Sequence, residues 1–319
     1  MRIVSLVPHA TELLFALSAG DELVAVTHEC DHPPAALELP RVTRDVLPAG
    51  LGAAEIDRAV RERTLEGGAI YELDRDALAA LEPELIVTQA LCPVCAVSYE
   101  DVAELAQRLP GAPRVIALDP NTLDETLADV TTVAAATGHL GQGAELLEDA
   151  EERIARVVGA VKGRPRPRVA ALEWLDPVYV AGHWTPQLIE LAGGRDVLGR
   201  AGEPSRTVSW EALAAAEPEV VVVMPCGYDA PRALAEAEAY AGELAGLNAA
   251  RIVAVNGSAY FSRPGPRLID GLELLGHILH RDCLPEAPGG AEALAVPGRS
   301  GEARAGGASN GDGAEHAAR

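Results

Sequence analysis

Aromatic and basic residues are both scarce in this chain. Phe, Trp and Tyr make up only 3% of its 319 residues, and 26 Lys plus Arg face 48 Asp plus Glu, which gives a formal net charge of −22. No run of four or more Lys or Arg residues offsets this acidity. Such an acidic chain is repelled by nucleic-acid phosphates and by anionic membrane surfaces, so we expect neither as a partner.

Long apolar runs are also missing. The longest strongly apolar run, VVVVM at 220–224, is far shorter than the roughly 18–20 residues of a membrane-spanning helix, so no membrane insertion is predicted. The N-terminal segment is interrupted at Pro8 and His9, before it can form the apolar stretch of a secretory signal. The sequence as written therefore predicts a cytoplasmic protein, and we expect a monomer.

Three common cofactor and catalytic motifs are absent. The sequence holds no G-x-x-x-x-G-K phosphate loop, no G-x-G-x-x-G after the first predicted strand, and no G-x-S-x-G nucleophile elbow. These absences weaken the interpretations of the chain as a nucleotide-dependent enzyme or a serine hydrolase.

Short buried apolar segments alternate with helical patterns along the first 283 residues. Strands are predicted at 3–7, 23–27, 84–89, 114–118, 168–174 and 220–224. Helices are predicted at 11–20 and 185–194, with Thr11 and Thr185 as their N-caps. This alternation is typical of an α/β fold with mainly parallel sheets and helices on both faces.

An internal similarity predicts two lobes of the same plan. DRDALAALEPELIV (74–87) and SWEALAAAEPEVVV (209–222) both give a capped helix, a Glu-Pro-Glu link and a buried strand. Between them, apolar residues at helical spacing predict one long helix over 143–163. We therefore predict an N-terminal lobe (1–140), a linking helix (141–163), a C-terminal lobe (164–283) and a disordered tail (284–319), with a ligand cleft between the lobes.

Residues able to bind ligands gather directly after the predicted strands. Ligands of open parallel sheets bind at that edge, so these positions are the candidate site. The candidates for ligand binding are Pro8, His9, His28, Asp31, His183, Trp184, Tyr228, Tyr260, Phe261 and Arg263. Each of them taken singly also fits an ordinary loop or core residue.

The five cysteines favour reduced thiols over a disulfide framework, because their number is odd and no export signal precedes them. Cys92 and Cys95 are spaced as two ligands of one zinc or iron ion, with Cys30 and Cys226 as further candidate ligands. The same Cys-x-x-Cys before a helix also fits a redox dithiol. A third interpretation treats them as plain loop or buried thiols.

Several motifs together resemble the substrate-binding proteins of ATP-binding cassette importers for cobalamin and iron chelates. The similar segments are RIVSLVPHATELLFALSAGDELVAVT, DHPP (31–34), LEPELIV, the long central helix and YFSRPGPRLIDGLELL (260–275). THECD, LCPVCAVS, EWLDPVYVAGHW and MPCG resemble a subgroup described as cobalamin-binding. The resemblance implies two lobes, a rigid helical connection and a ligand held in the cleft between the lobes.

The resemblance implies a binding protein with no catalytic residues. Its ligand would be a cobalamin-like corrinoid or a related chelate of iron-siderophore or haem type, with Trp184, Tyr260 and Phe261 as apolar faces. Asp76 and Glu211 align with the acids through which such proteins dock on an importer permease, although family members typically carry glutamate at both positions and are exported. Two alternatives stay open: a cytosolic metal- or thiol-dependent enzyme using Cys92 and Cys95, and a cytosolic scaffold or sensor.

Overall fold

The computed structural model describes residues 1–48, 50–65, 70–90, 98–289 and 291–296. Its first half is built on a four-stranded, wholly parallel sheet in the order β2-β1-β5-β6. The strands are β1 (Ile3–Ser5), β2 (Leu23–Ala25), β5 (Leu85–Thr88) and β6 (Arg114–Ala117). The helices around it are α1 (Pro8–Ala16), α3 (Arg75–Ala80), α4 (Tyr99–Arg108) and α5 (Leu123–Thr137).

The second half contains a seven-stranded mixed sheet, in the order β10-β8-β7-β11-β12-β13 with β9 paired to β7. Its strands are β7 (Arg168–Leu175), β8 (Val178–Val180), β9 (Arg195–Asp196), β10 (Arg206–Thr207), β11 (Val220–Val223), β12 (Arg251–Val255) and β13 (Ala293–Ala295). Its helices are α7 (Thr185–Leu191), α8 (Trp210–Ala215), α9 (Ala230–Ala239), α10 (Ala241–Gly246), α11 (Gly257–Tyr260) and α12 (Leu268–Leu279). The central strands β7, β11 and β12 run parallel.

Each sheet is buried on both faces, because successive side chains of its strands point to opposite sides. In β1, Ile3 packs into one apolar cluster and Val4 into another. In β11, Val220 and Val221 divide between two clusters in the same way. The predicted α/β class with mainly parallel sheets is confirmed.

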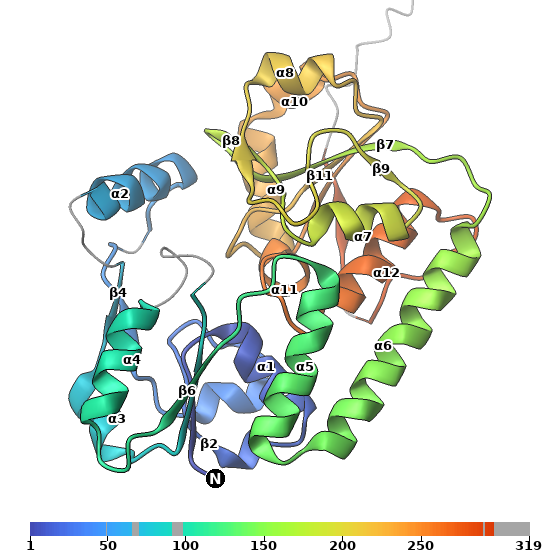
Figure 1. Cartoon of the computed structure of the whole chain (residues 1–319). Helices are drawn as coiled ribbons and strands as arrows, with labels where there is room; N and C mark the ends of the chain where they lie inside the picture. The colour runs from blue at the N-terminus through green and yellow to red at the C-terminus, as the bar shows by residue number, and fades with distance from the viewer. Residues whose placement is uncertain (49, 66–69, 91–97, 290, 297–319) are drawn as a thin grey trace, which may run out of the picture.

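Helix α6 (Leu140–Val161) runs between the two sheets and packs against α5 on one side and α12 on the other (Figure 1). It begins three residues before the predicted start at residue 143 and ends two residues before the predicted end at residue 163. Ala150, Val157 and Val161 are buried as the apolar stripe predicts, whereas Val158 is 38% exposed. Within the described residues, none of the helices combines the length and apolarity needed to cross a membrane.

The two halves repeat one detailed contact. The backbone N–H of Arg2 donates to the Glu84 carboxylate at 2.7 Å, and the backbone N–H of Arg168 donates to Glu219 at 2.8 Å. In each half, the arginine side chain also donates to the carbonyl of the residue that caps the helix before the Glu-Pro-Glu link, Leu81 after α3 and Ala216 after α8. The first Glu of each Glu-Pro-Glu link has a positive φ, 44° at Glu82 and 43° at Glu217. The sequence similarity is therefore a repeat of backbone conformation as well.

The structure differs from the predicted start of both capped helices. Helix α1 begins at Pro8, so Thr11 lies inside it, and the Thr11 hydroxyl donates to the Ser5 hydroxyl at 2.8 Å instead of capping. Helix α7 begins at Thr185 itself, with Trp184 as the N-cap residue. Proline is the first residue of α1 and the second residue of α7, and at both positions its missing N–H breaks no helical hydrogen bond.

The segment beyond residue 283 is not wholly a disordered tail, which corrects the prediction. Strand β13 pairs antiparallel with β12, matching Ala293 to Val255 and Ala295 to Val253. Backbone hydrogen bonding at a sheet edge needs no apolar periodicity, so the composition of this segment gave no sign of it.

A further unit was not predicted from the sequence. Strands β3 (Thr43–Asp45) and β4 (Tyr71–Leu73) form a separate antiparallel pair, and helix α2 (Ala53–Leu65) lies between them in sequence. In Figure 1, α2 stands apart from the first sheet, on the same side of the molecule as β8. A hydrogen bond of 3.5 Å from the Arg61 side chain to the Tyr179 hydroxyl links α2 to the second half.

Candidate functional site

One cavity is lined by loops from both halves of the chain, at the carboxyl ends of their strands. Its volume is about 380 Å³. It is lined by Asp31, His32, Gly227, Asp229, Arg232, Asn256, Ser258, Ala259, Arg263 and Arg267. The first two residues follow β2, and the others follow β11 and β12. We take this cleft between the two halves as the candidate site.

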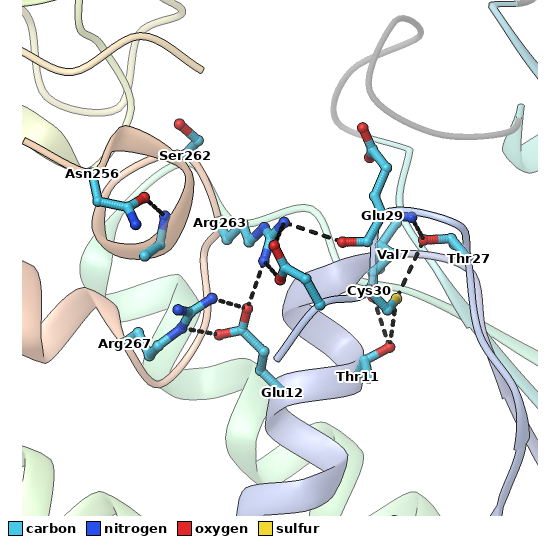
Figure 2. Close-up of polar contacts among 12 residues, drawn as sticks. Val7, Thr11, Glu12, Thr27, Glu29, Cys30, Asn256, Ser262, Arg263 and Arg267 are labelled. Carbon is cyan, nitrogen blue, oxygen red and sulfur yellow. Dashed lines mark hydrogen bonds and ion pairs between the residues drawn. The ribbon is translucent and has the colours of Figure 1, made fainter. Parts of the chain in front are cut away.

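Two arginines of the second half bind acids of the first half (Figure 2). Arg267 donates two hydrogen bonds to the Glu12 carboxylate, at 2.5 and 2.8 Å. Arg263 contacts Glu12 at 3.2 Å and Asp31 at 2.5 Å. Glu12 is only 3% exposed, so its charge is balanced almost entirely by these two guanidinium groups. The network fixes α1 and the loop after β2 against the segment that precedes α12.

The third arginine of the cavity has a different environment. The Arg232 guanidinium lies over the Tyr228 ring, 3.7 Å from its centroid, and Tyr228 is buried against Trp174. The Arg232 backbone N–H donates to Asp229 Oδ1 at 2.8 Å, which caps α9. Arg232 itself is exposed. A positive charge is therefore presented to the cavity on a buried aromatic platform.

His9 lies in the first turn of α1, three residues before Glu12 of the ion-pair network. It is 3% exposed, and its Nε2 has no hydrogen-bond partner. Burial, together with the charge of Arg263, lowers the pKa of His9 to about 3, so its imidazole is neutral at neutral pH. Pro8 precedes it as the first residue of α1 and is also buried. Neither residue lines the cavity, although both are predicted ligand-binding residues.

His28 and Cys30 face the first half of the molecule instead of the cavity. His28 Nδ1 lies 2.7 Å from the Thr43 hydroxyl, and its ring is 5.0 Å from that of Tyr71. The Cys30 sulfur lies 3.0 Å from the Thr11 hydroxyl and 3.2 Å from that of Thr27 (Figure 2). Burial raises the pKa of the Cys30 thiol. A buried, protonated thiol of this kind is a poor metal ligand, which argues against Cys30 as predicted.

The predicted aromatic faces are mostly inside the second half. Trp184 is 5% exposed and Phe261 1% exposed, and the Trp184 indole N–H donates to the Phe261 carbonyl at 2.8 Å. Both belong to the core cluster on one face of the second sheet, as does the partly buried Tyr260 at its edge. This corrects the expectation that Trp184 and Phe261 offer apolar faces to a ligand. The chain has few aromatic residues, and Trp184 and Phe261, which the sequence pattern assigned to the cleft, pack in the core instead.

His183 is held in the left-handed region, at φ 50°, by the loop at 202–203. Its backbone N–H donates to the Glu203 carbonyl at 2.6 Å, and its carbonyl accepts from Gly202 at 2.9 Å. Its ring stacks on Trp184, and burial lowers its pKa. His183 therefore lies beside the core aromatics and does not line the cavity.

The structure describes only part of the predicted thiol site. Cys92 and Cys95 lie outside the described residues. Cys226 is exposed and adjoins the cavity residue Gly227, whereas Cys30 is buried. In the part of the chain that the structure describes, no group of three or more His, Cys, Asp or Glu residues could hold a metal ion.

The two predicted docking acids occupy equivalent places in the two halves. Asp76 lies in the first turn of α3 and Glu211 in the first turn of α8, and both are exposed. The helices that carry them lie at the outer ends of the two halves (Figure 1). Backbone and Ser209 hydrogen bonds lower the pKa of Glu211.

Of the predicted ligand-binding residues, Asp31 and Arg263 line the cavity together. Glu12, Arg232 and Arg267 were missed. Arg267 stands in the same SRPGPRL motif as Arg263, so its position was available from the sequence. Glu12 and Arg232 lie on helices, α1 and α9, where charged residues are ordinarily solvated, and no sequence signal separates them from that background.

Comparison with known proteins gives this cleft a family setting. The sequence profile of the periplasmic binding protein family matches residues 3–251. The vitamin B12-binding protein of Vibrio cholerae serotype O1 is 24% identical over 277 residues, which cover 85% of this chain and 86% of that protein.

Two solved structures share the fold. The periplasmic vitamin B12 binding protein of Vibrio cholerae matches with a TM-score of 0.64 at 24% identity, covering 87% of this chain and 96% of that one. A periplasmic heme binding protein from Pseudomonas aeruginosa matches with a TM-score of 0.66 at 22% identity, covering 94% and 99%. The likeness in structure spans both halves and the helix between them.

Proposed function

Because this chain belongs to the periplasmic binding protein family, we propose that it binds a metal chelate of a large macrocycle, a corrinoid or a haem, in the cleft between its two halves. The observation that carries the proposal is the cavity of about 380 Å³ that loops of both halves line at the carboxyl ends of their strands. Relatives with this fold are named as binding vitamin B12 or heme.

The cavity constrains how such a ligand would sit. Its volume of about 380 Å³ is near the lower end of the range for small-molecule sites. Its walls are polar and charged, because the aromatic side chains nearby are buried in the core. The cavity therefore suits the polar edge of a macrocycle.

The family also bears on the enzyme alternative and on location. The thiol-dependent enzyme is not supported by the relatives, and Cys92 and Cys95 lie outside the described residues. The two related structures are those of periplasmic proteins, so the predicted cytoplasmic location has no support from them. We propose Asp76 and Glu211 as docking residues for an importer permease, on the grounds that both are exposed at equivalent places of the repeat.

Direct titration tests the binding function. Purified protein is titrated with hydroxocobalamin and with haem, followed by absorption and by calorimetry, and a 1:1 complex is expected with at least one of them. Arg263→Gln should weaken binding, because Arg263 both lines the cavity and joins its two sides. Arg75→Gln, on the exposed surface at α3, is the matched control. Absence of binding to both macrocycles would overturn the proposal.

A further inference from the structure

We propose that Arg232 selects ligands that carry an anionic group on their periphery, a carboxylate or a phosphate, by pairing with that group. The inference rests on the proposed function and deepens it by naming a chemical class. Of the three arginines that line the cavity, two are already neutralised by acids, and Arg232 is not.

The charges of Arg263 and Arg267 are balanced by carboxylates of the protein itself. Glu12 forms an ion pair with each of them, and Asp31 forms a further ion pair with Arg263. The Arg263 and Arg267 side chains are only 12% and 17% exposed. A ligand anion would have to displace a buried or hydrogen-bonded carboxylate to reach them. The free energy lost by breaking that ion pair exceeds the free energy gained from the new contact.

Arg232 has no such competitor. Among the described residues, no carboxylate forms an ion pair with its guanidinium, although the charge of Arg232 acts at longer range on Glu236, one turn further along α9. Asp229, the nearest acid in sequence, directs Oδ1 to the Arg232 backbone N–H, where it caps α9. Apart from the contact with Tyr228, the guanidinium donors of Arg232 are therefore available to the cavity.

The position of Arg232 is also partly fixed before any ligand binds. Its guanidinium is 3.7 Å from the centroid of the Tyr228 ring, and Tyr228 is held in the core by its edge contact with Trp174. The planar fork of an arginine stacked on an aromatic ring keeps its edge free for bidentate pairing with a carboxylate or phosphate. Less side-chain entropy is lost on pairing than for a freely rotating arginine.

Two pairs of macrocycles that differ in their anionic groups test this. The first pair is haem and its dimethyl ester, which lacks the two carboxylates. The second is cobalamin and cobinamide, which lacks the nucleotide loop together with its phosphodiester, so here the change caused by Arg232→Gln is the measure. In the wild-type protein, the member of a pair that carries the anion should bind about 10- to 100-fold more tightly, as expected for one charge-assisted contact.

In the pair that shows this preference, Arg232→Gln should bind the anionic and the neutral member equally. Arg232→Lys should recover part of the difference in affinity. The pair that shows the effect identifies whether carboxylate or phosphate is recognised. Arg75→Gln should leave the difference unchanged. Arg232 is exposed, so the folded state should survive, and matched thermal transitions of the variants verify this.

The two possible failures are distinguishable. Failure of the wild-type protein to bind any of the four macrocycles would overturn the proposed function and this inference with it. Binding in which the anionic member has no advantage, or keeps its advantage in Arg232→Gln, would overturn only the role of Arg232.

Discussion

Glu12 and Arg267 are 255 residues apart in the sequence, and their side chains meet in a two-point ion pair at 2.5 and 2.8 Å. Glu12 belongs to the helix that follows the first strand, and Arg267 precedes the last long helix. The pair therefore joins the two halves at the cleft, in addition to the connection through α6.

Replacing Glu12 by Gln should destabilise the protein substantially. The variant keeps the size of the side chain and leaves Arg263 and Arg267 without their shared buried counter-charge. Breaking a buried ion pair from one side costs about 3–5 kcal/mol, and the partial exposure of both arginines places the expected loss near the lower figure. Urea unfolding measures it.

Glu104→Gln provides the control for this variant. Glu104 pairs with Arg108 on the surface of α4, and both side chains are more than half exposed. An exposed pair of this kind contributes little, so its loss should change stability by under about 1 kcal/mol. Equal losses in the two variants would show that the Glu12 contact contributes no more than a surface pair.

The stability of the protein should fall with acid through His9. Its folded pKa is about 3, against 6.5 in the unfolded chain, so the unfolded state binds the extra proton between these values. Stability from this group is complete above pH 6.5 and is lost as pH falls towards 3. At pH 5 the loss is about 2 kcal/mol, from 1.36 kcal/mol per pH unit.

The variant His9→Gln isolates this contribution. It cannot take up a proton, so its midpoint of urea unfolding should change less between pH 7.5 and pH 5 than that of the wild type. His139→Gln is the comparison, since His139 is less buried and is bound to Glu22. An unchanged pH slope in His9→Gln would show that His9 is not buried as a neutral group.

The end of the ordered chain can be tested by truncation. A chain ending at Val296 keeps β13, whereas one ending at Cys283 loses both β13 and Leu284, whose side chain packs on α12 beside Gly276. The shorter chain should be less stable by about 1–3 kcal/mol, through lost strand pairing and apolar contact. Identical thermal midpoints for the two chains would restore the prediction of a tail that begins at residue 284.

The cysteines should differ in their reactivity. Cys30 is buried with a raised pKa, whereas Cys226 is exposed. Alkylation with iodoacetamide at pH 8, followed by peptide mass mapping, should modify Cys226 at least about tenfold faster than Cys30, because the thiolate is the reacting form. In 6 M urea the two rates should converge. Equal rates in the native protein would mean that Cys30 is accessible.

The fold was predictable because it rests on local patterns. Buried runs such as 3–7 and 220–224 can only be strands between helices, and the repeated Glu-Pro-Glu link fixes the same turn twice. The unit formed by β3, α2 and β4 escaped prediction because its strands are short and the helical residues whose burial the structure describes are at most partly buried, so its apolar pattern is weak.

The site was predictable only as a region. Strand ends correctly locate Asp31 and Arg263, because the carboxyl edge of a parallel sheet is set by topology. Which side chains face the cavity depends on packing between the halves. Trp184 and Phe261 pack into the core, and Glu12 becomes buried only because arginines from the far end of the chain reach it.

The ion pairs across the cleft also set an order of events during synthesis. Glu12 is made 251 residues before Arg263 and 255 residues before Arg267. An unpartnered carboxylate stays hydrated, because its burial alone costs several kcal/mol. The first sheet can therefore complete its own core while this face of α1 remains in water. Only after the segment at 260–267 has left the ribosome can these ion pairs form and the two halves close on each other, so the cleft forms late.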